Sequence, residues 1–199
     1  VKQTRGKDIV IDDIPVDDPK TYELFSKGQT TAVFQFESAP MREYLKRLKA
    51  TSISDLSAMN ALYRPGPMDY IEEFISCKHG KKKITYLHPL LEPILKETYG
   101  VIVYQEQVIQ IANKIAGMTL AEADLLRRAV SHFDPGKQMQ DLRMKFIRGA
   151  EERMGIPSDL GERIWELMAA FAGYGFPKAH AASYAVVGWR SAWCKTHFP

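Results

Sequence analysis

The segment TLAEADLLRRA, residues 119–129, contains a helix-start signal followed by two adjacent cations. Thr119 and Glu122 have the Thr-x-x-Glu spacing of a capping box, in which each side chain accepts a hydrogen bond from a backbone N–H at the start of the helix. Arg127 and Arg128 lie two turns further along. The segment therefore predicts a capped helix that presents two guanidinium groups side by side.

Helical patterns continue on both sides of this segment, so we expect a mostly α, multi-helix domain with a few short β-strands. Asp18-Pro19 has the residues of an N-cap and first helical position, and Arg64-Pro65-Gly66-Pro67 predicts a rigid turn. The β-branched and aromatic residues at 30–36 indicate a strand. The expected helices cover residues 19–28, 38–49, 52–63, 68–79, 88–98, 104–116, 137–154, 158–172 and 178–196. The capped helix that begins at 119 is expected to be broken by Phe-Asp-Pro-Gly at 133–136, and further short strands are expected at 9–11 and 101–103.

Composition excludes several classes of protein. The chain has 199 residues, of which 45% are hydrophobic and 26% charged, as is usual for a globular protein. The net charge of +3 is too small to indicate a nucleic-acid binder by itself. No apolar run approaches the roughly 20 residues of a membrane span. Cys77 and Cys194 predict reduced thiols, and the start at Val1 suggests an excerpt of a larger protein.

Metal sites and nucleophilic catalysis have little support in the sequence. Four carboxylates lie close together at Asp12, Asp13, Asp17 and Asp18, but residues 14–16 separate the two pairs, and a helix N-cap is the favoured interpretation. The histidines form no His-Glu-x-x-His or zinc-finger spacing. The glycine-rich phosphate loops and the nucleophile elbow are also absent from the sequence.

The arginine pair has two interpretations. Planar guanidinium groups match phosphate oxygens with two parallel bonds, so Arg127 and Arg128 can bind one anion together. Alternatively, they lie on a solvated helix face and pair with Asp124, three and four residues earlier. Physical chemistry alone favours the second interpretation.

A second candidate site is the segment GYGFPKAHAASY, residues 173–184. A glycine-rich turn leads into a helix whose first turns carry Lys178, His180 and Ser183. Helix N-termini offer unbonded N–H groups and partial positive charge, which suits an anion. A tight loop packed under a core helix is the equally favoured alternative.

Several stretches, in order, resemble the bacterial DNA polymerase III alpha subunits, which are C-family replicative polymerases. The resemblance extends from about residue 8 to residue 199. It rests on TTAVFQFES (30–38), ALYRPGP (61–67), KHG (78–80), ETYGV (97–101), VYQEQV (103–108), ADLLRRA (123–129) and FAGYGF (171–176) with Lys178, His180 and Ala181.

The resemblance implies the end of the palm connection at residues 1–36 and a fingers domain at 37–199. It implies DNA-directed DNA synthesis, in which a primer 3′-hydroxyl attacks the α-phosphate of a dNTP. The required Mg²⁺ would be held by palm aspartates that precede this stretch, so we expect the isolated chain to be inactive. Primer–template DNA, dNTP and other replisome subunits are the implied partners, in the bacterial cytoplasm.

Under this interpretation the fingers supply cations for the triphosphate and surfaces for the template. We expect nucleotide binding by Arg127, Arg128, Lys178 and His180, with His180 a proton donor to pyrophosphate. Template or base contacts are expected from Tyr104, Tyr174, Ser183 and Tyr184, since rings stack on bases.

Two departures from the family pattern indicate a divergent member. Residues 130–133 are VSHF where the family usually has Met-Gly-Lys-Lys, and Pro177 and Ala179 flank Lys178. The choice between a main replicative and an accessory polymerase stays open. From other classes, a non-catalytic helical module that binds nucleic acid or protein is the alternative, and a metal-dependent hydrolase lacks ligands.

Overall fold

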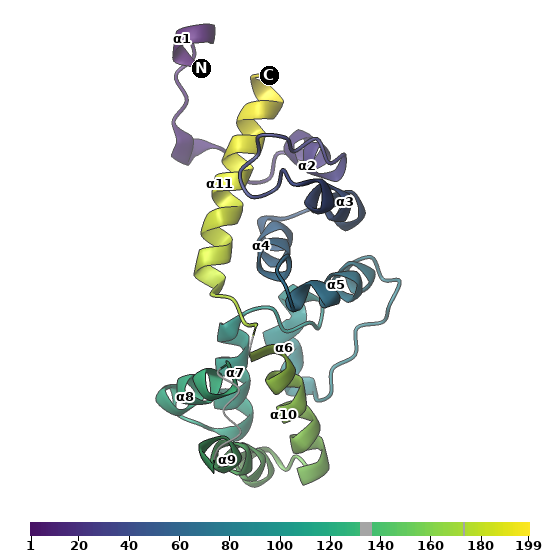
Figure 1. The fold of residues 1–199 in the computed structure, drawn as a ribbon, viewed down its shortest axis with the longest axis vertical. Coiled ribbons are helices and arrows are strands. Elements are labelled where there is room, and N and C mark those ends of the chain that lie inside the picture. Colours follow the sequence, from purple (N-terminus) through teal and green to yellow (C-terminus); the bar gives the residue numbers. More distant parts are fainter. Residues whose placement is uncertain (132–136, 173) are drawn as a thin grey trace. The chain divides into compact units, whose positions relative to one another are not determined.

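A computed structural model describes residues 1–131, 137–172 and 174–199 of the chain. These residues form two compact units, Val1–Tyr63 with Ala179–Pro199, and Arg64–Lys178. Helix α11 (Lys178–His197) begins at the last residue of the second unit and belongs otherwise to the first (Figure 1). The predicted division between residues 36 and 37 stays a prediction, as does the break predicted at 133–136, which lies outside the described residues.

In the first unit, several short helices precede α11 in the sequence, and α2 contacts α11 through aromatic rings. Asp18 caps α2 through its carboxylate, which accepts the backbone N–H of Thr21 at 3.0 Å, so the predicted N-cap is confirmed. The Oγ of Ser52 accepts from the N–H of Asp55 at the start of α4 in the same way. The elements of this unit before α11 are α1 (Lys2–Arg5), the 3-10 turn η1 (Ile11–Asp13), α2 (Pro19–Ser26), α3 (Ala39–Leu48) and α4 (Ile53–Leu62).

The core of the first unit gathers around Trp189 of α11. Trp189 and Phe25 of α2 are both fully buried, and their rings stack with centroids 6.1 Å apart. The indole N–H of Trp189 donates to the carbonyl of Pro15 at 2.8 Å. A Cβ on Gly188 would lie 2.5 Å from the ring of Phe36, so this glycine allows residues 30–36 to pack against the helix backbone.

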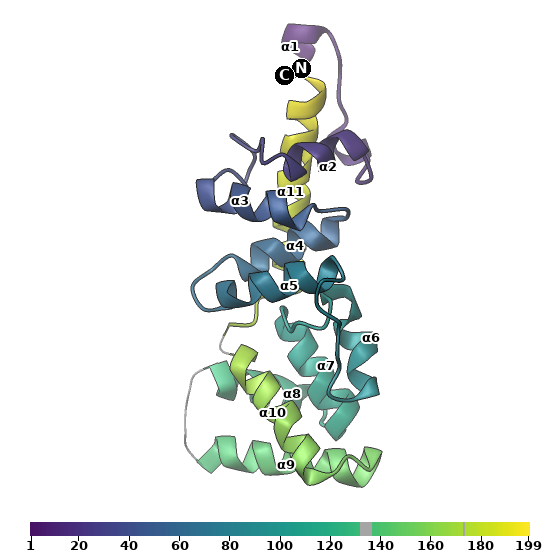
Figure 2. The same cartoon turned by 90° about the vertical axis from the view of Figure 1, so that its right-hand side faces the viewer.

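In the second unit, α7 lies beside α8 and α9 (Figure 1), and α10 lies beside α9 (Figure 2). A Cβ on Gly149 of α9 would come within 2.2 Å of the carbonyl oxygen of Ala116, so a side chain there would hold the two helices apart. The elements of this unit are η2 (Pro67–Tyr70), α5 (Ile71–Lys78), η3 (Pro89–Leu91), α6 (Glu92–Leu95), η4 (Lys96–Thr98), α7 (Gln105–Ala116), α8 (Leu120–Ser131), α9 (Lys137–Met154) and α10 (Ser158–Ala172).

The expectation of short β-strands was wrong, because the described residues contain only an isolated bridge between Tyr104 and Phe176. Residues 30–36 form turns, with left-handed backbone at Ala32 and Gln35. At 101–103, the side-chain oxygen of Gln107 accepts a hydrogen bond from the backbone N–H of Val103 at 2.8 Å. In a β-sheet, this N–H would instead bond to a neighbouring strand. Residues 9–11 are largely exposed and enter the turn η1.

Among the described residues, no helix combines the length and apolar character needed to cross a membrane. Cys77 and Cys194 are free thiols, as predicted. The acidic cluster near the N-terminus is divided between local roles: Asp18 caps α2, and Asp12 pairs with Arg190 at 2.7 Å. Within the part of the chain that the structure describes, no group of three or more His, Cys, Asp or Glu side chains could hold a metal ion.

Candidate functional site

The capping box at the start of α8 forms as the sequence predicts. The N–H of Thr119 donates to the Glu122 carboxylate at 2.9 Å, and the N–H of Glu122 donates to the Thr119 hydroxyl at 3.3 Å. Lys145 of α9 also bonds to this carboxylate, and these contacts lower the pKa of Glu122 to about 2, with the Lys145 bond the largest cause. The first turn of α8 is therefore fixed both locally and by α9.

The arginine pair further along α8 shares the carboxylate of Asp124. Arg127 contacts one carboxylate oxygen at 2.8 Å, and Arg128 contacts the other at 2.6 Å. These hydrogen bonds, that of Arg127 first, lower the pKa of Asp124. The structure thus shows the pairing that physical chemistry favoured. Asp124 therefore holds the two guanidinium groups side by side on the helix.

Lys178, at the start of α11, is tied to residues far away in the sequence. Its ammonium group contacts both carboxylate oxygens of Glu97, at 2.7 and 2.8 Å, and lies 5.7 Å from the ring centre of Tyr104. Its backbone N–H points at the carboxylate of Glu106, with oxygens at 3.0 and 3.1 Å. The sequence predicted an anion site at the N-terminus of this helix. In the structure, the first N–H of the helix donates to a carboxylate of the protein itself, that of Glu106.

The loop before Lys178 is fastened to the start of α7. The N–H of Gln105 donates to the carbonyl of Phe176 at 3.1 Å, and the N–H of Phe176 donates to the carbonyl of Val103 at 3.4 Å. A Cβ on Gly175 would lie 3.2 Å from the Cα of Gln105, so the loop passes close against that backbone. These contacts confirm a tight loop at residues 174–177.

Arg64 also contacts the loop 174–177, although no binding role was predicted for it from the sequence. Its guanidinium group donates to the carbonyl of Tyr174 at 2.7 Å and lies 4.2 Å from the ring centre of Phe176. Partial burial lowers the pKa of the group. The sequence signal was present, since Arg64 opens the Arg-Pro-Gly-Pro turn, but the loop that it holds is 110 residues away.

The turn after Arg64 packs against the same loop. Gly66 has a φ of 96°, and a Cβ there would lie 2.3 Å from the ring of Tyr174. Glycine is therefore required both by the left-handed backbone and by the neighbouring ring. The two tyrosines of this unit that were predicted to contact the template differ in exposure, because Tyr174 is 43% exposed whereas Tyr104 is 2% exposed.

The remaining predicted residues belong to the first unit. The rings of His180 and Tyr184, one turn apart on α11, have centroids 4.2 Å apart. The hydroxyl of Ser183 donates to the carbonyl of Ala179, inside its own helix, at 2.9 Å. The structure thus brings His180 and Tyr184 together, and in the second unit it brings Lys178 and Tyr104 together.

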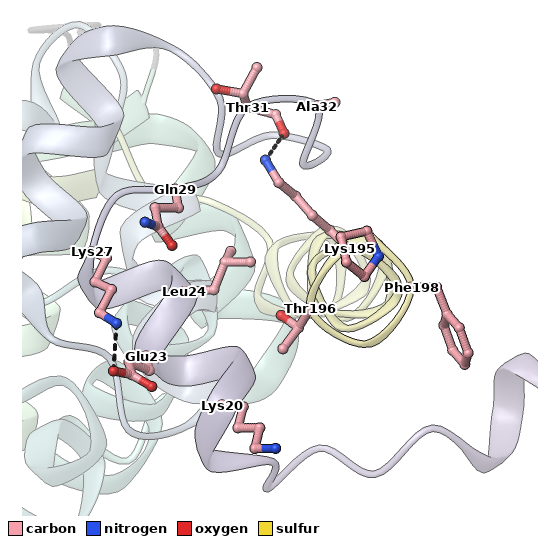
Figure 3. Close-up of a pocket in the computed structure, with 11 residues that line it drawn as sticks. Lys20, Glu23, Leu24, Lys27, Gln29, Thr31, Ala32, Lys195, Thr196 and Phe198 are labelled. Carbon is pink, nitrogen blue, oxygen red and sulfur yellow. Dashed lines mark hydrogen bonds and ion pairs between the residues drawn. The ribbon is translucent and has the colours of Figure 1, made fainter.

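The first unit also contains an open pocket that the sequence analysis did not foresee (Figure 3). Its volume is about 1020 Å³, and it lies between α2, residues 29–32 and the end of α11. Its charged lining consists of three lysines and one glutamate, so positive charge predominates. These residues are Lys20, Lys27, Lys195 and Glu23.

A family model of polymerase finger domains matches residues 1–154. The chain therefore belongs to this family, described as the bacterial DNA polymerase III alpha subunit finger domain. Relatives named DNA polymerase III subunit alpha are similar to it over nearly its whole length. That of Halalkalibacterium halodurans is 49% identical over 199 residues, that of Caulobacter vibrioides 51% over 196, and that of Thermus aquaticus 45% over 204.

These matches cover 100%, 98% and 100% of this chain, in the same order, but only 18%, 17% and 17% of the relatives. The chain thus spans less than a fifth of the length of each. The resemblance to the C-family polymerases is confirmed at the level of the family.

Proposed function

We propose that this chain is the fingers region of a DNA-directed DNA polymerase that transfers nucleotides from dNTP to a primer 3′-hydroxyl. Its membership of the finger-domain family supports the proposal. The observation that carries it is the arginine pair on α8, whose two guanidinium groups are held side by side by Asp124. We further propose that it works in the bacterial cytoplasm with primer–template DNA and other replisome subunits.

In this proposal Arg127 and Arg128 bind the β- and γ-phosphates of the incoming nucleotide. A guanidinium group has five N–H donors in a fixed plane, so a bond to Asp124 is compatible with a bond to phosphate. The Asp124 carboxylate holds both groups at neighbouring positions before the nucleotide arrives. Such pre-organisation reduces the ordering that binding requires.

We assign Lys178 and His180 to the phosphates or to the leaving pyrophosphate, with His180 as the proton donor. The ion pair with Glu97 holds the Lys178 ammonium in place, and phosphate would compete with Glu97 for it. Tyr174, Ser183 and Tyr184 are the proposed contacts for the template or a base. Tyr104 is buried, so we propose that its ring contributes by holding the Lys178 ammonium group, which lies over it.

Divalent metal is a further part of the proposal for the whole subunit. The described residues offer no cluster of three acidic, histidine or cysteine ligands, so these residues do not fit a Mg²⁺ site. We propose that the metal is held by palm carboxylates elsewhere in the subunit. The chain's own role is to bind and orient the triphosphate and the template.

Primer extension tests the proposal. A full-length subunit that contains this stretch should extend a primer with dNTP and Mg²⁺, and the 199-residue chain alone should give no extension above background. Extension by the chain alone would show that the catalytic carboxylates lie within it. A full-length subunit that binds DNA but never extends a primer would instead support a binding module.

A further inference from the structure

Phe34 is an exposed aromatic residue on the turns at residues 30–36 of the first unit. Its side chain is 42% exposed, while Val33 and Phe36 on either side of it are fully buried. The two buried residues anchor the segment in the core and leave Phe34 directed outward. Single exposed apolar residues are common, so the surroundings of Phe34 decide whether it has a role.

The segment that carries Phe34 is held in an unfavourable backbone conformation. Ala32 has a φ of 59° and Gln35 a φ of 67°, a left-handed region that residues with a Cβ rarely adopt. The conformation is fixed by side chains, because the Thr30 hydroxyl donates to the Phe36 carbonyl at 2.6 Å. The Ala32 N–H also donates to the Glu37 carboxylate at 2.9 Å. Strain retained in this way is typical of functional segments.

The ring of Phe34 extends a row of rings along α11. Phe34 and Tyr184 have ring centroids 5.2 Å apart, and Tyr184 in turn contacts His180. The backbone N–H of Phe34 donates to the hydroxyl of Ser191 at 3.2 Å, which fixes the segment to the helix. The result is three adjacent rings on a rigid support.

Two cations contact Thr31, three residues before Phe34. The Lys195 ammonium donates to the carbonyl of Thr31 at 2.7 Å (Figure 3), and Arg42 donates to the hydroxyl of the same threonine at 3.2 Å. Thr31 and Ala32 also line the pocket in which lysines predominate. Rings for bases beside cations for phosphates are the combination that binds single-stranded nucleic acid.

We propose that Phe34, with Tyr184, forms a stacking platform for an unpaired base of the template strand, and that the adjacent lysines bind the strand's phosphates. This inference rests on the proposed polymerase function and adds a residue that the sequence analysis did not select. A protein partner would also cover an apolar side chain, but the positive lining matches a polyanion.

The test measures DNA binding by the full-length subunit at one fixed salt concentration. The variants are Phe34→Leu, which keeps apolar volume without a ring, and Phe34→Trp, which keeps a ring. Val10→Ala is the control, because Val10 is an exposed apolar residue of the same unit, at 62%. The probes are a primer–template with a single-stranded template overhang, the same DNA with abasic overhang positions, and blunt duplex.

Phe34→Leu should lose roughly 5- to 100-fold in affinity for the overhang DNA, as stacked bases usually do when a ring is removed. It should lose little on abasic or blunt DNA, because the base that it contacts is absent there. Phe34→Trp should bind like wild type, and the fluorescence that the added tryptophan contributes beyond the wild-type signal should be quenched by the stacked base. Val10→Ala should also bind like wild type.

Equal losses of Phe34→Leu on all three DNAs, or no loss on any, would overturn the inference. If Phe34→Leu fails to fold, Phe34→Trp decides, since unquenched fluorescence in the DNA complex rules out stacking. A wild-type subunit that extends primers while Phe34 variants bind normally removes only Phe34 from the site. A wild-type subunit that neither binds nor extends primer–template contradicts the proposed function itself.

Discussion

The two candidate cationic sites in the unit Arg64–Lys178 are held in opposite ways. The arginine pair on α8 is paired with Asp124, which is three and four residues away on the same helix. The Lys178 ammonium is paired with Glu97, 81 residues away, and its backbone N–H donates to Glu106, 72 residues away. One site is organised by a single helix, whereas the other exists only when distant segments have folded together.

This difference has consequences for what each residue can contribute. The Arg128 side chain is 65% exposed and that of Arg127 21%, and ion pairs within one turn of a helix surface stabilise a fold by only about 0–1 kcal/mol. Replacing the arginines should therefore reveal their role in binding without unfolding the unit. Contacts between distant segments determine where the loop 174–177 lies, so replacing them should alter local stability as well.

The largest expected effect is on nucleotide kinetics at the local site. In the full-length subunit, Arg127→Ala or Arg128→Ala should lower kcat/KM for dNTP about 10- to 100-fold, because a charge-assisted bond to phosphate contributes roughly 1.5–3 kcal/mol. The melting temperature should change little, since arginine and alanine have similar helix propensities. Lysine should replace either arginine only in part, because it lacks the planar group.

Arg143→Ala is the matched control for this prediction. Arg143 is also a helix-surface arginine, and it pairs with Glu162 at 2.6 Å. Its replacement should leave kcat/KM unchanged. Normal nucleotide kinetics in both single mutants and the double mutant would remove the α8 pair from the site and leave it a structural role.

The sequence predicted best the parts that depend on neighbouring residues. The capping box of Thr119 and Glu122 formed, and the predicted bounds 137–154 and 158–172 coincide with α9 and α10. The Asp124 pairing was also among the stated alternatives. Each of these features is determined within one or two helical turns, so the period and the capping residues suffice.

Features that depend on distant residues were not predicted. The tie between Arg64 and the carbonyl of Tyr174 spans 110 residues, and no local pattern indicates it. The expected strand at 101–103 failed for the same reason, because Gln107 satisfies the backbone donors that a strand would offer to a neighbour. β-propensity describes a fit to a sheet, and this unit supplies none in its described residues.

The next largest effect is expected at Arg64, which holds the loop that precedes Lys178. Arg64→Ala removes a charged hydrogen bond and a ring contact, so the loop 174–177 should open more easily by about 2 kcal/mol. Hydrogen exchange at Phe176, measured by mass spectrometry or NMR, should then be roughly 30-fold faster. Arg64→Lys should fall between wild type and alanine. Unchanged exchange in Arg64→Ala would show that the bridge to Tyr104 holds the loop alone.

A smaller effect is expected at the start of α11. Glu106→Gln keeps an oxygen near the N–H of Lys178 but removes the negative charge at the helix N-terminus, which should destabilise the first turn by about 0.5–1 kcal/mol. Faster hydrogen exchange at residues 178–181 is the readout. Glu152→Gln, at an exposed glutamate of α9, is the control. Equal exchange in both variants would contradict the capping role of Glu106.

The smallest expected effect is a pH dependence at the start of α8. The pKa of Glu122 is lowered from 4.5 to about 2 by Lys145 and Thr119, so the folded state holds this carboxylate in its charged form. Its contribution to stability is present above pH 4.5 and is lost as the pH falls toward 2. Glu122→Gln should therefore reduce the fall in melting temperature between pH 6 and pH 3.

A variant of Lys145 distinguishes the two causes of this pH dependence, which are the contact with α9 and the capping box within α8. Lys145→Met removes the tie to α9 and leaves the capping box, so it should remove most of the pH effect if the α9 contact dominates, as its position as the largest cause indicates. An unchanged pH dependence in Lys145→Met, together with a reduced one in Glu122→Gln, would assign the effect to Thr119. The start of α8 would then be organised by contacts within its own helix, as the Asp124 pairing of the two arginines is.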